Sequence, residues 1–183
     1  MPDFTLLDDT HDLSRFDCGE RDINRWIRNE AIKRHKRFDS RVRVTCPGDS
    51  NRVEAFYSLQ LAIEDTKNLQ GEHRQKFPHG RAAGFPCIRL QYLGVTETRQ
   101  RQGLGSQALL DAVLRASLAL ESNGGYAIVL QPIGGSEAFY EKLDFEVYGT
   151  GIERRMILPY ETAMTILARY RERSTDYDRW LKY

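Results

Sequence analysis

The sequence predicts one domain of the mixed α/β (α+β) class, in which helices flank a mostly antiparallel sheet. Two observations carry this prediction. Apolar strand patterns alternate with helical patterns over the 183 residues, and the first two long strand patterns are joined by a short turn. A chain of this length can bury a substantial core. We expect residues 1–159 to form the domain and residues 160–183 to form a C-terminal helical extension packed on it.

The N-terminal part predicts a short strand followed by an amphipathic helix. The strand is expected at residues 4–7. Apolar residues then recur at helical spacing and predict one buried stripe, formed by Ile23, Trp26, Ile27 and Ala31. Asp17 and Glu20 have the spacing of a capping box, which predicts that this helix begins beside them.

The middle of the chain predicts a hairpin, a long connection and a further strand. Alternating apolar side chains predict strands at residues 41–46 and 53–61, paired as a hairpin around a Pro-Gly turn at 47–51. Residues 64–84 are polar and without a clear period, so we expect a long connection there. It is either a loop on the side of the acceptor substrate or a surface loop without a role. A third strand is expected at residues 87–95.

The C-terminal half alternates helix and strand. One face of the helix after residue 105 is expected to consist of Leu110, Val113, Leu114 and Ser117, and Asn123-Gly124-Gly125 is expected to end it. Strands follow at residues 126–130, 145–148 and 155–158, with a short helix at 136–143 and a last helix at 161–182.

Composition narrows the class of protein. The formal net charge is +1, no apolar run is long enough to span a bilayer, and the acidic N-terminus lacks the layout of a signal peptide. We therefore expect a cytoplasmic protein that does not enter a membrane. Cys18, Cys46 and Cys87 are odd in number, far apart and without a CxxC pair, which argues against a disulfide framework and against a metal site. We expect all three to be small buried hydrophobes.

The loop between the strand at 87–95 and the following helix predicts an anion site. Residues 100–105 read QRQGLG. Gly103 and Gly105 lack a Cβ, and the backbone N–H groups at a helix N-terminus suit a phosphate. Arg99 and Arg101 add positive charge. The sequence has neither a GxxxxGK[ST] motif nor a GxGxxG motif with a ribose-binding acid. The alternative interpretation is a tight turn that binds no ligand.

Charge is distributed unevenly along the N-terminal part. Negative side chains collect in residues 3–22 and positive ones in residues 25–43. The basic residues near the end of the predicted helix include Lys33, Arg34, Lys36 and Arg37. We interpret these four residues as a surface that binds the phosphate backbone of a nucleic acid. The alternative is a solvated helix face.

Two of these stretches are similar to those of a known family. The Gln100-x-x-Gly103-x-Gly105 loop resembles the Q/R-x-x-G-x-G/A loop of the GNAT N-acetyltransferases, which holds the pyrophosphate of acetyl-CoA. Residues 138–145, AFYEKLDF, resemble the FYEKxGF region of that family. Asp144 stands in place of the usual glycine. Because aspartate tolerates a left-handed conformation better than most residues, we expect the turn to be kept.

The N-terminal stretch resembles one branch of this family, the toxins of bacterial toxin–antitoxin modules. The residues that carry this likeness are His11, Phe16, Cys18, Gly19, Ile23, Trp26 and Ile27, and the AFYSL segment at 55–59 fits as well. The resemblance spans residues 4–158 and implies a single GNAT domain with splayed central strands. It implies a toxin that acetylates the α-amine of aminoacyl-tRNA and thereby blocks translation, a ribbon-helix-helix antitoxin as partner, and a homodimer as the assembly.

The same resemblance implies roles for individual residues. Tyr140 is the implied acid that protonates the leaving thiolate of coenzyme A, the alternative being a core aromatic. A backbone N–H near Val95 polarises the thioester carbonyl, and Leu93 and Val95 pair with the pantetheine amides. The remaining acetyl-CoA-binding residues are those of the loop: Gln100, Arg101, Gln102, Gly103, Leu104, Gly105 and Ser106. No metal is implied.

The basicity of the acceptor bears on the mechanism. A free α-amine has a pKa of about 8, so roughly a tenth of it is neutral at pH 7, whereas lysine, with a pKa of about 10.4, is almost entirely charged. An α-amine therefore needs little help from a general base, for which Glu97, His73 and His79 are the candidates. Two other functions stay open. One is an ordinary GNAT that acetylates a small amine or a protein or peptide amine, and the other is a non-enzymatic GNAT-fold binding subunit.

Overall fold

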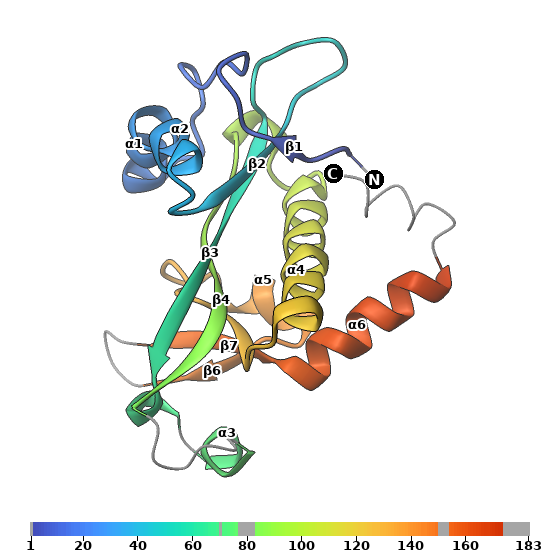
Figure 1. The fold of residues 1–183 in the computed structure, drawn as a ribbon. Helices are drawn as coiled ribbons and strands as arrows, with labels where there is room; N and C mark the ends of the chain where they lie inside the picture. Colours follow the sequence, from blue (N-terminus) through green and yellow to red (C-terminus); the bar gives the residue numbers. More distant parts are fainter. Residues whose placement is uncertain (1, 70, 77–82, 150–153, 174–183) are drawn as a thin grey trace. The chain divides into compact units, whose positions relative to one another are not determined.

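The computed structural model describes residues 2–69, 71–76, 83–149 and 154–173 (Figure 1). Seven strands form one sheet in the order β1-β2-β3-β4-β5-β7-β6. Their bounds are β1 (Thr5–Leu6), β2 (Arg41–Thr45), β3 (Ala55–Asp65), β4 (Gly84–Val95), β5 (Ala127–Leu130), β6 (Glu146–Tyr148) and β7 (Arg155–Pro159). The pairs β1/β2, β2/β3, β5/β7 and β6/β7 are antiparallel. The predicted fold class, a mixed α/β protein with a mostly antiparallel sheet, is confirmed.

The chain divides into two compact units. Unit 1 comprises Met1–Ala62 and Ile88–Ala112, and unit 2 comprises Ile63–Cys87 and Val113–Tyr183, so that β3, β4 and α4 contribute to both. The helices are α1 (Arg21–Asn29), α2 (Ala31–Lys36), α3 (Gly71–Lys76), α4 (Leu104–Asn123), α5 (Glu137–Tyr140) and α6 (Tyr160–Arg173), with short 3-10 turns η1 (Thr66–Asn68), η2 (Glu97–Arg99) and η3 (Glu141–Leu143).

The core of unit 1 contains the apolar stripe predicted from the sequence. Ile23, Trp26, Ile27 and Ala31 are all buried, although Glu30 separates α1 from α2. The ring of Phe56 lies 5.2 Å from that of Phe16 and 6.0 Å from that of Trp26, centroid to centroid. This aromatic cluster joins the N-terminal segment, α1 and β3 into one core.

Gly94 allows β4 to approach this aromatic cluster. A Cβ at this position would lie 2.8 Å from Cε1 of Phe56, 3.1 Å from Cζ of Phe16 and 3.3 Å from Cγ2 of Ile23. These distances leave no room for a side chain next to rings that are themselves fully packed. The glycine therefore brings the end of β4, just before Val95, against the N-terminal segment.

The capping box predicted for α1 is not formed. Glu20 is the N-cap residue and makes no side-chain capping bond, and α1 begins at Arg21. The carboxylate of Asp17 instead accepts hydrogen bonds from the backbone N–H of Gly19 (3.0 Å) and from Nδ2 of Asn24 (2.6 Å). Gly19 has a φ of +85°, and this left-handed turn makes Asp17 close its own loop rather than the helix.

The connection expected at residues 64–84 contains more regular structure than predicted. β3 continues to Asp65, where η1 begins, α3 covers Gly71–Lys76, and β4 already starts at Gly84. These helical pieces are one or two turns long, too short to produce a helical period in the sequence. Leu69 is buried, and Tyr126 donates a hydrogen bond from its hydroxyl to the carbonyl of His73 (2.9 Å), so tertiary contacts of unit 2 hold the segment.

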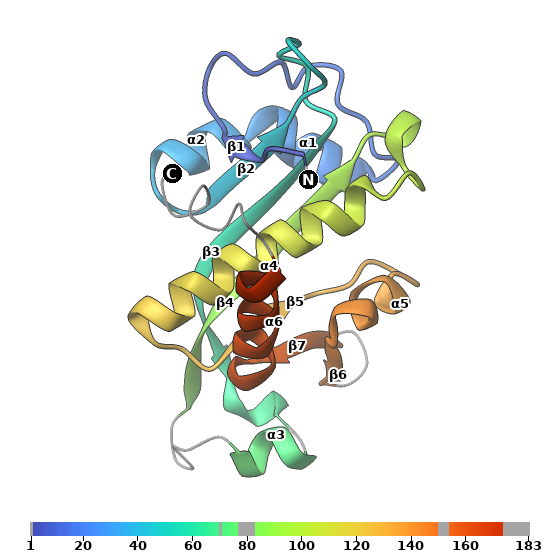
Figure 2. The ribbon, with the colours of Figure 1, turned by 90° about the vertical axis from the view of Figure 1, so that its right-hand side faces the viewer.

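Unit 2 places α6 against β5 and β7 (Figure 2). Ala163 and Leu167 of α6 are buried. On α4, the hydroxyl of Ser117 donates to the carbonyls of Val113 (2.7 Å) and Ala163 (3.3 Å). The hydroxyl predicted to lie on the packed face of α4 therefore joins that helix to α6.

The turn before β6 has the conformation predicted for it. Asp144 has φ 61° and ψ 24°, in the left-handed region that favours glycine. Asp144 is the C-cap residue of η3, and its N–H donates to the carbonyl of Glu141 (3.0 Å). Aspartate thus keeps the turn that precedes the buried Phe145.

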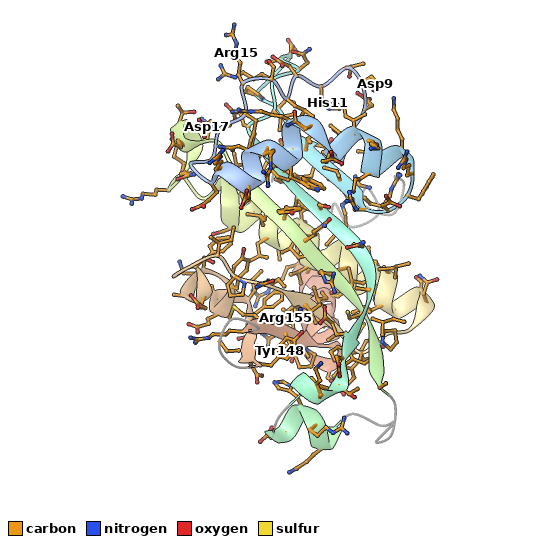
Figure 3. The ribbon with its side chains drawn as sticks, turned by 90° about the vertical axis from the view of Figure 1, so that its left-hand side faces the viewer. Asp9, His11, Arg15, Asp17, Tyr148 and Arg155 are labelled. Atoms are coloured by element: carbon orange, nitrogen blue, oxygen red, sulfur yellow. The ribbon has the colours of Figure 1, made fainter. Side chains whose placement is uncertain are left out.

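A partly buried ion pair lies in unit 2. The guanidinium of Arg155 on β7 contacts the carboxylate of Glu64, whose side chain is 2% exposed. Arg155 and the neighbouring Tyr148 are shown in Figure 3. Burial is the largest cause that raises the pKa of Tyr148, and the carboxylate of Glu64 raises it further. The phenol is therefore neutral at physiological pH.

The cysteines are free thiols; Cys18 and Cys87 are buried as expected, whereas Cys46 is half-buried. Within the described ranges, no helix has the length and apolar character needed to cross a bilayer.

Candidate functional site

The loop between β4 and α4 leads into the N-terminus of α4, where several backbone N–H groups have no partner within the helix. The first N–H to bond to a carbonyl of the helix turn is that of Gln107, which donates to Gly103 (3.1 Å). The N–H groups of Leu104, Gly105 and Ser106 precede it and cannot bond within α4. Such an end is suited to an anion because the unpaired N–H groups and the helix dipole act together.

Two residues of this loop have a left-handed backbone conformation, which turns the chain from β4 into α4. Arg101 has a φ of +59° and Gly103 a φ of +85°. A Cβ on Gly103 would meet no described atom within 4 Å, so glycine is required there by its backbone conformation rather than by crowding. Arg101 is exposed and makes no ion pair with any described residue, whereas Arg99 pairs with the carboxylate of Glu54 (3.1 Å). Arg101 is therefore the cation of this loop that is available to a ligand.

Gln100 joins the loop to two other segments of unit 1. Its Nε2 donates to the carbonyl of Cys18 (2.9 Å) and to that of Val95 (3.0 Å). Its backbone N–H donates to the carbonyls of Thr96 (3.1 Å) and Glu97 (3.3 Å), so this N–H is not available to a ligand as those of residues 104–106 are. Among the residues that the structure describes, Gln102 bonds only within the loop, from Nε2 to the carbonyl of Thr98 (2.9 Å).

The N-terminal segment is also hydrogen-bonded to the start of the loop after β4. The N–H of Glu97 donates to the carbonyl of Asp17 (2.9 Å), and the N–H of Thr96 donates to that of Glu54 (2.8 Å). Val95 is 7% exposed and Leu93 is half-buried. The role of residues 16–19 in holding the loop was missed from the sequence, because backbone carbonyls leave no signature in residue type.

Tyr140 belongs to unit 2, at the C-terminal end of α5. Its ring lies 5.0 Å from that of Phe139 and 6.1 Å from that of Phe145, both in edge-to-face geometry. Burial raises the pKa of Tyr140 to about 12. The phenol therefore keeps its proton throughout the physiological pH range.

The basic residues expected to contact nucleic acid lie on and just after α2. Lys33, Lys36 and Arg37 are exposed and Arg34 is half-buried. Lys36 pairs with Asp9 (2.6 Å), and the other three make no ion pair with the described part of the chain. Phe38, next in the chain, is 78% exposed, with the guanidinium of Arg41 4.9 Å from its ring centroid. His35 on the opposite face is buried, and its Nδ1 accepts from the N–H of Val42 (3.0 Å).

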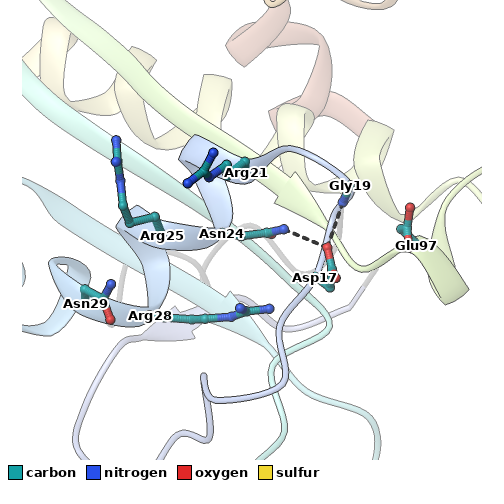
Figure 4. Close-up of a pocket in the computed structure, with 8 residues that line it drawn as sticks. All are labelled: Asp17, Gly19, Arg21, Asn24, Arg25, Arg28, Asn29 and Glu97. Carbon is teal, nitrogen blue, oxygen red and sulfur yellow. Dashed lines mark hydrogen bonds between the residues drawn. The ribbon is translucent and has the colours of Figure 1, made fainter.

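A cavity of about 620 Å³ lies beside α1 (Figure 4). It is lined by Asp17, Gly19, Arg21, Asn24, Arg25, Arg28, Asn29 and Glu97. All eight residues belong to unit 1. The sequence analysis placed Arg25 and Arg28 in the basic stretch 25–43 and gave Arg21 no role. The cavity could not be predicted because it depends on how Asp17 and Glu97 meet α1.

The candidate bases differ in their surroundings. Glu97 is exposed at the cavity, whereas His73 in unit 2 pairs through Nε2 with Glu146 (3.1 Å). His79 lies outside the described residues. Within the ranges that the structure describes, His, Cys, Asp and Glu side chains do not gather into a group of three that could hold a metal.

Comparison with known proteins adds independent evidence. No family model matches the chain. The tRNA-acetylating toxin of Mycobacterium tuberculosis (strain ATCC 25618 / H37Rv) is 32% identical over 153 residues, which cover 83% of this chain and 89% of that protein.

Two solved structures resemble the fold at lower identity. AtaT complexed with acetyl-methionyl-tRNAfMet matches with a TM-score of 0.77 and 21% identity, over 90% of this chain and 99% of that one. A tyrosine-to-phenylalanine variant of the AtaT toxin, bound to the C-terminus of the antitoxin AtaR and to acetyl-CoA, matches with a TM-score of 0.72 and 20% identity, over 90% and 96% of the two chains.

Proposed function

The chain belongs to the family of tRNA-acetylating GNAT toxins, and from this membership we propose that it transfers the acetyl group of acetyl-CoA to the α-amine of an aminoacyl-tRNA. The acylated amine can no longer form a peptide bond, so translation stops. The observation that carries the proposal is the open N-terminus of α4, which follows the Gln100-x-x-Gly103-x-Gly105 loop in a chain 32% identical to a tRNA-acetylating toxin.

The loop is suited to hold the pyrophosphate of acetyl-CoA. We assign the contacts to the backbone N–H groups of Leu104, Gly105 and Ser106, with Arg101 adding charge and Gln102 and Gly103 shaping the approach. Gln100 acts as a positioning residue, because its amide is already engaged with two carbonyls. When bound, acetyl-CoA supplies the thioester that the acceptor amine attacks.

The remaining roles follow from the end of β4 and from α5. The backbone N–H of Val95 is assigned to the acyl carbonyl oxygen, and Leu93 and Val95 are assigned to the pantetheine amides. Tyr140 holds a proton on its hydroxyl for the departing sulfur. No strong base is needed on the acceptor side, because roughly a tenth of an α-amine is already neutral at pH 7.

The partners follow from the same membership. The surface formed by Lys33, Arg34, Lys36 and Arg37 is assigned to tRNA phosphates. A ribbon-helix-helix antitoxin is the expected protein partner, supported by the fold shared with AtaT bound to AtaR. We place the protein in the cytoplasm, where charged tRNA is used.

Transfer from labelled acetyl-CoA to total aminoacylated tRNA tests the proposal. We expect label on charged tRNA and none on deacylated tRNA, with strongly reduced labelling by Tyr140→Phe. Label on polyamines, peptides or proteins but not on charged tRNA would refute the tRNA substrate and point to an ordinary GNAT activity. Charged tRNAs that are labelled can then be separated by isoacceptor to identify the amino acid.

A further inference from the structure

The cavity beside α1 carries arginines at a regular spacing. Arg21, Arg25 and Arg28 are separated by four and three residues and so lie on one face of the helix (Figure 4). Arg28 is held in place by the carbonyl of Phe16, to which its Nε donates (2.9 Å). A guanidinium fork suits phosphate oxygens because it can donate two parallel hydrogen bonds.

Two of these arginines are available to a ligand. Arg25 pairs with Asp22 at 3.0 Å, but both side chains are more than two-thirds exposed, and such a pair is weak. Arg21 makes no hydrogen bond or ion pair with any residue that the structure describes. A phosphate entering the cavity would therefore displace at most one exposed ion pair.

The opposite wall of the cavity is acidic. Hydrogen bonds from Gly19 and Asn24 fix the carboxylate of Asp17 and lower its pKa. Glu97 is the second acid at the wall. A ligand that satisfies both walls carries an anion and a cation within a short distance.

The cavity lies close to the part of the chain where we place the acyl carbonyl. Glu97 lines it and follows Val95 by two residues, so their Cα atoms are at most about 7.6 Å apart. The N–H of Glu97 also donates to the carbonyl of Asp17 (2.9 Å), which fixes the acidic wall to the end of β4.

We propose that this cavity binds the 3′ end of the acceptor RNA, with Arg21 and Arg25 on a backbone phosphate and the acidic wall facing the α-amino group of the attached amino acid, which binds as the ammonium and attacks after it has lost its proton. The inference rests on the proposed function. In an aminoacyl-tRNA, one ribose and one ester separate the last phosphate from the amine, so both charges are present in one ligand. Coenzyme A offers a phosphate as well but carries no cation, which favours the RNA as the source.

The test compares two acceptors and three variants. Aminoacyl-tRNA contains the phosphate, whereas puromycin presents an amino acid on a nucleoside without any backbone phosphate. The variants are Arg21→Gln, Arg25→Gln and the matched control Arg15→Gln, an exposed arginine of the same unit that does not line the cavity. The dissociation constant for acetyl-CoA is measured for each variant by calorimetry.

We expect Arg21→Gln and Arg25→Gln each to raise KM for aminoacyl-tRNA roughly tenfold, the size of one charged hydrogen bond. Transfer to puromycin and the dissociation constant for acetyl-CoA should not change, and Arg15→Gln should resemble the wild type. An equal loss with puromycin, an unchanged KM for aminoacyl-tRNA, or a weaker affinity for acetyl-CoA would each overturn the proposal, the last by assigning the cavity to the phosphate of coenzyme A.

Direct binding of tRNA separates this inference from the proposed function. The slope of log affinity against log salt concentration should fall by about 0.7 to 0.9 for each phosphate that Arg21→Gln or Arg25→Gln no longer neutralises. A wild-type protein that acetylates neither acceptor would refute the proposed function. An unaltered salt slope in the two variants would refute the cavity assignment, whatever the activity.

Discussion

Tyr140 holds its phenol proton more tightly than an exposed tyrosine does. The pKa of Tyr140 is about 12, whereas that of a thiol is about 8.5. Complete proton transfer from the phenol to a thiolate therefore costs roughly 5 kcal/mol. A hydrogen bond that strengthens as the sulfur acquires charge, with the proton transferred late, is the less costly route. For an ordinary phenol, which is all that the sequence indicates, the same transfer would cost only about 2 kcal/mol.

Replacing Tyr140 by Phe is expected to lower turnover at least tenfold while leaving the fold and the affinity for acetyl-CoA unchanged. The ring contacts with Phe139 and Phe145 are kept by phenylalanine, and only the hydroxyl is removed. Single-turnover transfer with saturating acetyl-CoA measures the effect. A rate equal to that of the wild type would exclude Tyr140 as the acid.

The pH profile tests the same residue from another side. Because the proton of Tyr140 is retained up to about pH 11, kcat/KM should rise as the α-amine deprotonates near pH 8 and then stay level to pH 10. Initial rates between pH 6 and 10 measure this. A decline above pH 9 that disappears in Tyr140→Phe would show that the phenol ionises earlier than its burial indicates.

His35 makes stability depend on mildly acidic pH. Burial, followed by the nearby charges of Arg41 and Arg43, lowers its pKa from 6.5, while Asp8 acts in the opposite direction. The unfolded chain then binds more protons than the folded one below pH 6.5, so stability is present above this value and is lost as the pH falls through the lowered pKa.

Urea unfolding between pH 7.5 and 5 measures this effect. The free energy of unfolding should fall by up to about 1.4 kcal/mol per pH unit from this one group. In His35→Asn, whose Oδ1 replaces Nδ1 as the acceptor for the N–H of Val42, the decline over this range should be smaller. Equal slopes in the two proteins would mean that His35 does not cause the decline.

At the scale of the element, the loop between β4 and α4 contains two glutamines, of which the motif specifies Gln100 and leaves Gln102 open. Gln100 bonds to carbonyls of the N-terminal segment and of β4, whereas the side chain of Gln102 bonds to the carbonyl of Thr98 in its own turn. We expect Gln100→Ala to weaken acetyl-CoA binding about tenfold, because it removes two hydrogen bonds of about 1 kcal/mol each that fix the loop. Gln102→Ala should change the affinity less than threefold, because the one bond it removes is local to the loop.

Calorimetric titration with acetyl-CoA measures the difference, and thermal unfolding of the same proteins tests whether the loop alone is affected. Equal dissociation constants for the two variants would mean that the bond from Gln100 to Cys18 does not position the loop.

Most elements could be predicted from the sequence because their patterns are long. The stripe from Ile23 to Ala31, the β2–β3 hairpin and the left-handed turn at Asp144 are all as expected. The predicted capping box of Asp17 and Glu20 and the irregular connection predicted after Asp65 were wrong, since a glycine turn and short helices depend on tertiary contacts rather than on periodicity.

At the scale of the whole molecule, a neutral total conceals separate charged regions. The net charge is +1, yet the basic surface of Lys33, Arg34, Lys36 and Arg37 and the arginine cavity both belong to unit 1. The basic surface followed from the order of charges along the chain. The cavity could not be predicted in the same way, because it depends on the conformation of residues 16–19, which residue type alone does not indicate.

Neutralising Lys33 and Arg37 together should weaken tRNA binding and lower its salt slope by about 0.7 to 0.9 for each phosphate that is no longer neutralised. Lys36→Gln is the matched variant and should have a smaller effect, because a phosphate must first compete with Asp9 for the ammonium of Lys36. Binding isotherms at several salt concentrations measure both. An unchanged slope in the Lys33 and Arg37 double variant would mean that these residues form a solvated helix face and do not bind tRNA.

The bond between Gln100 and the N-terminal segment has a consequence for how relatives of this protein are compared. Both of its acceptors are backbone carbonyls, those of Cys18 and Val95, so the side chains at positions 18 and 95 can drift in evolution without disturbing it. Pairwise covariation between the N-terminal motif and the loop 82 positions away should therefore be silent, although the two are in direct contact. The persistence of a donor side chain at position 100 is the trace that such a coupling leaves.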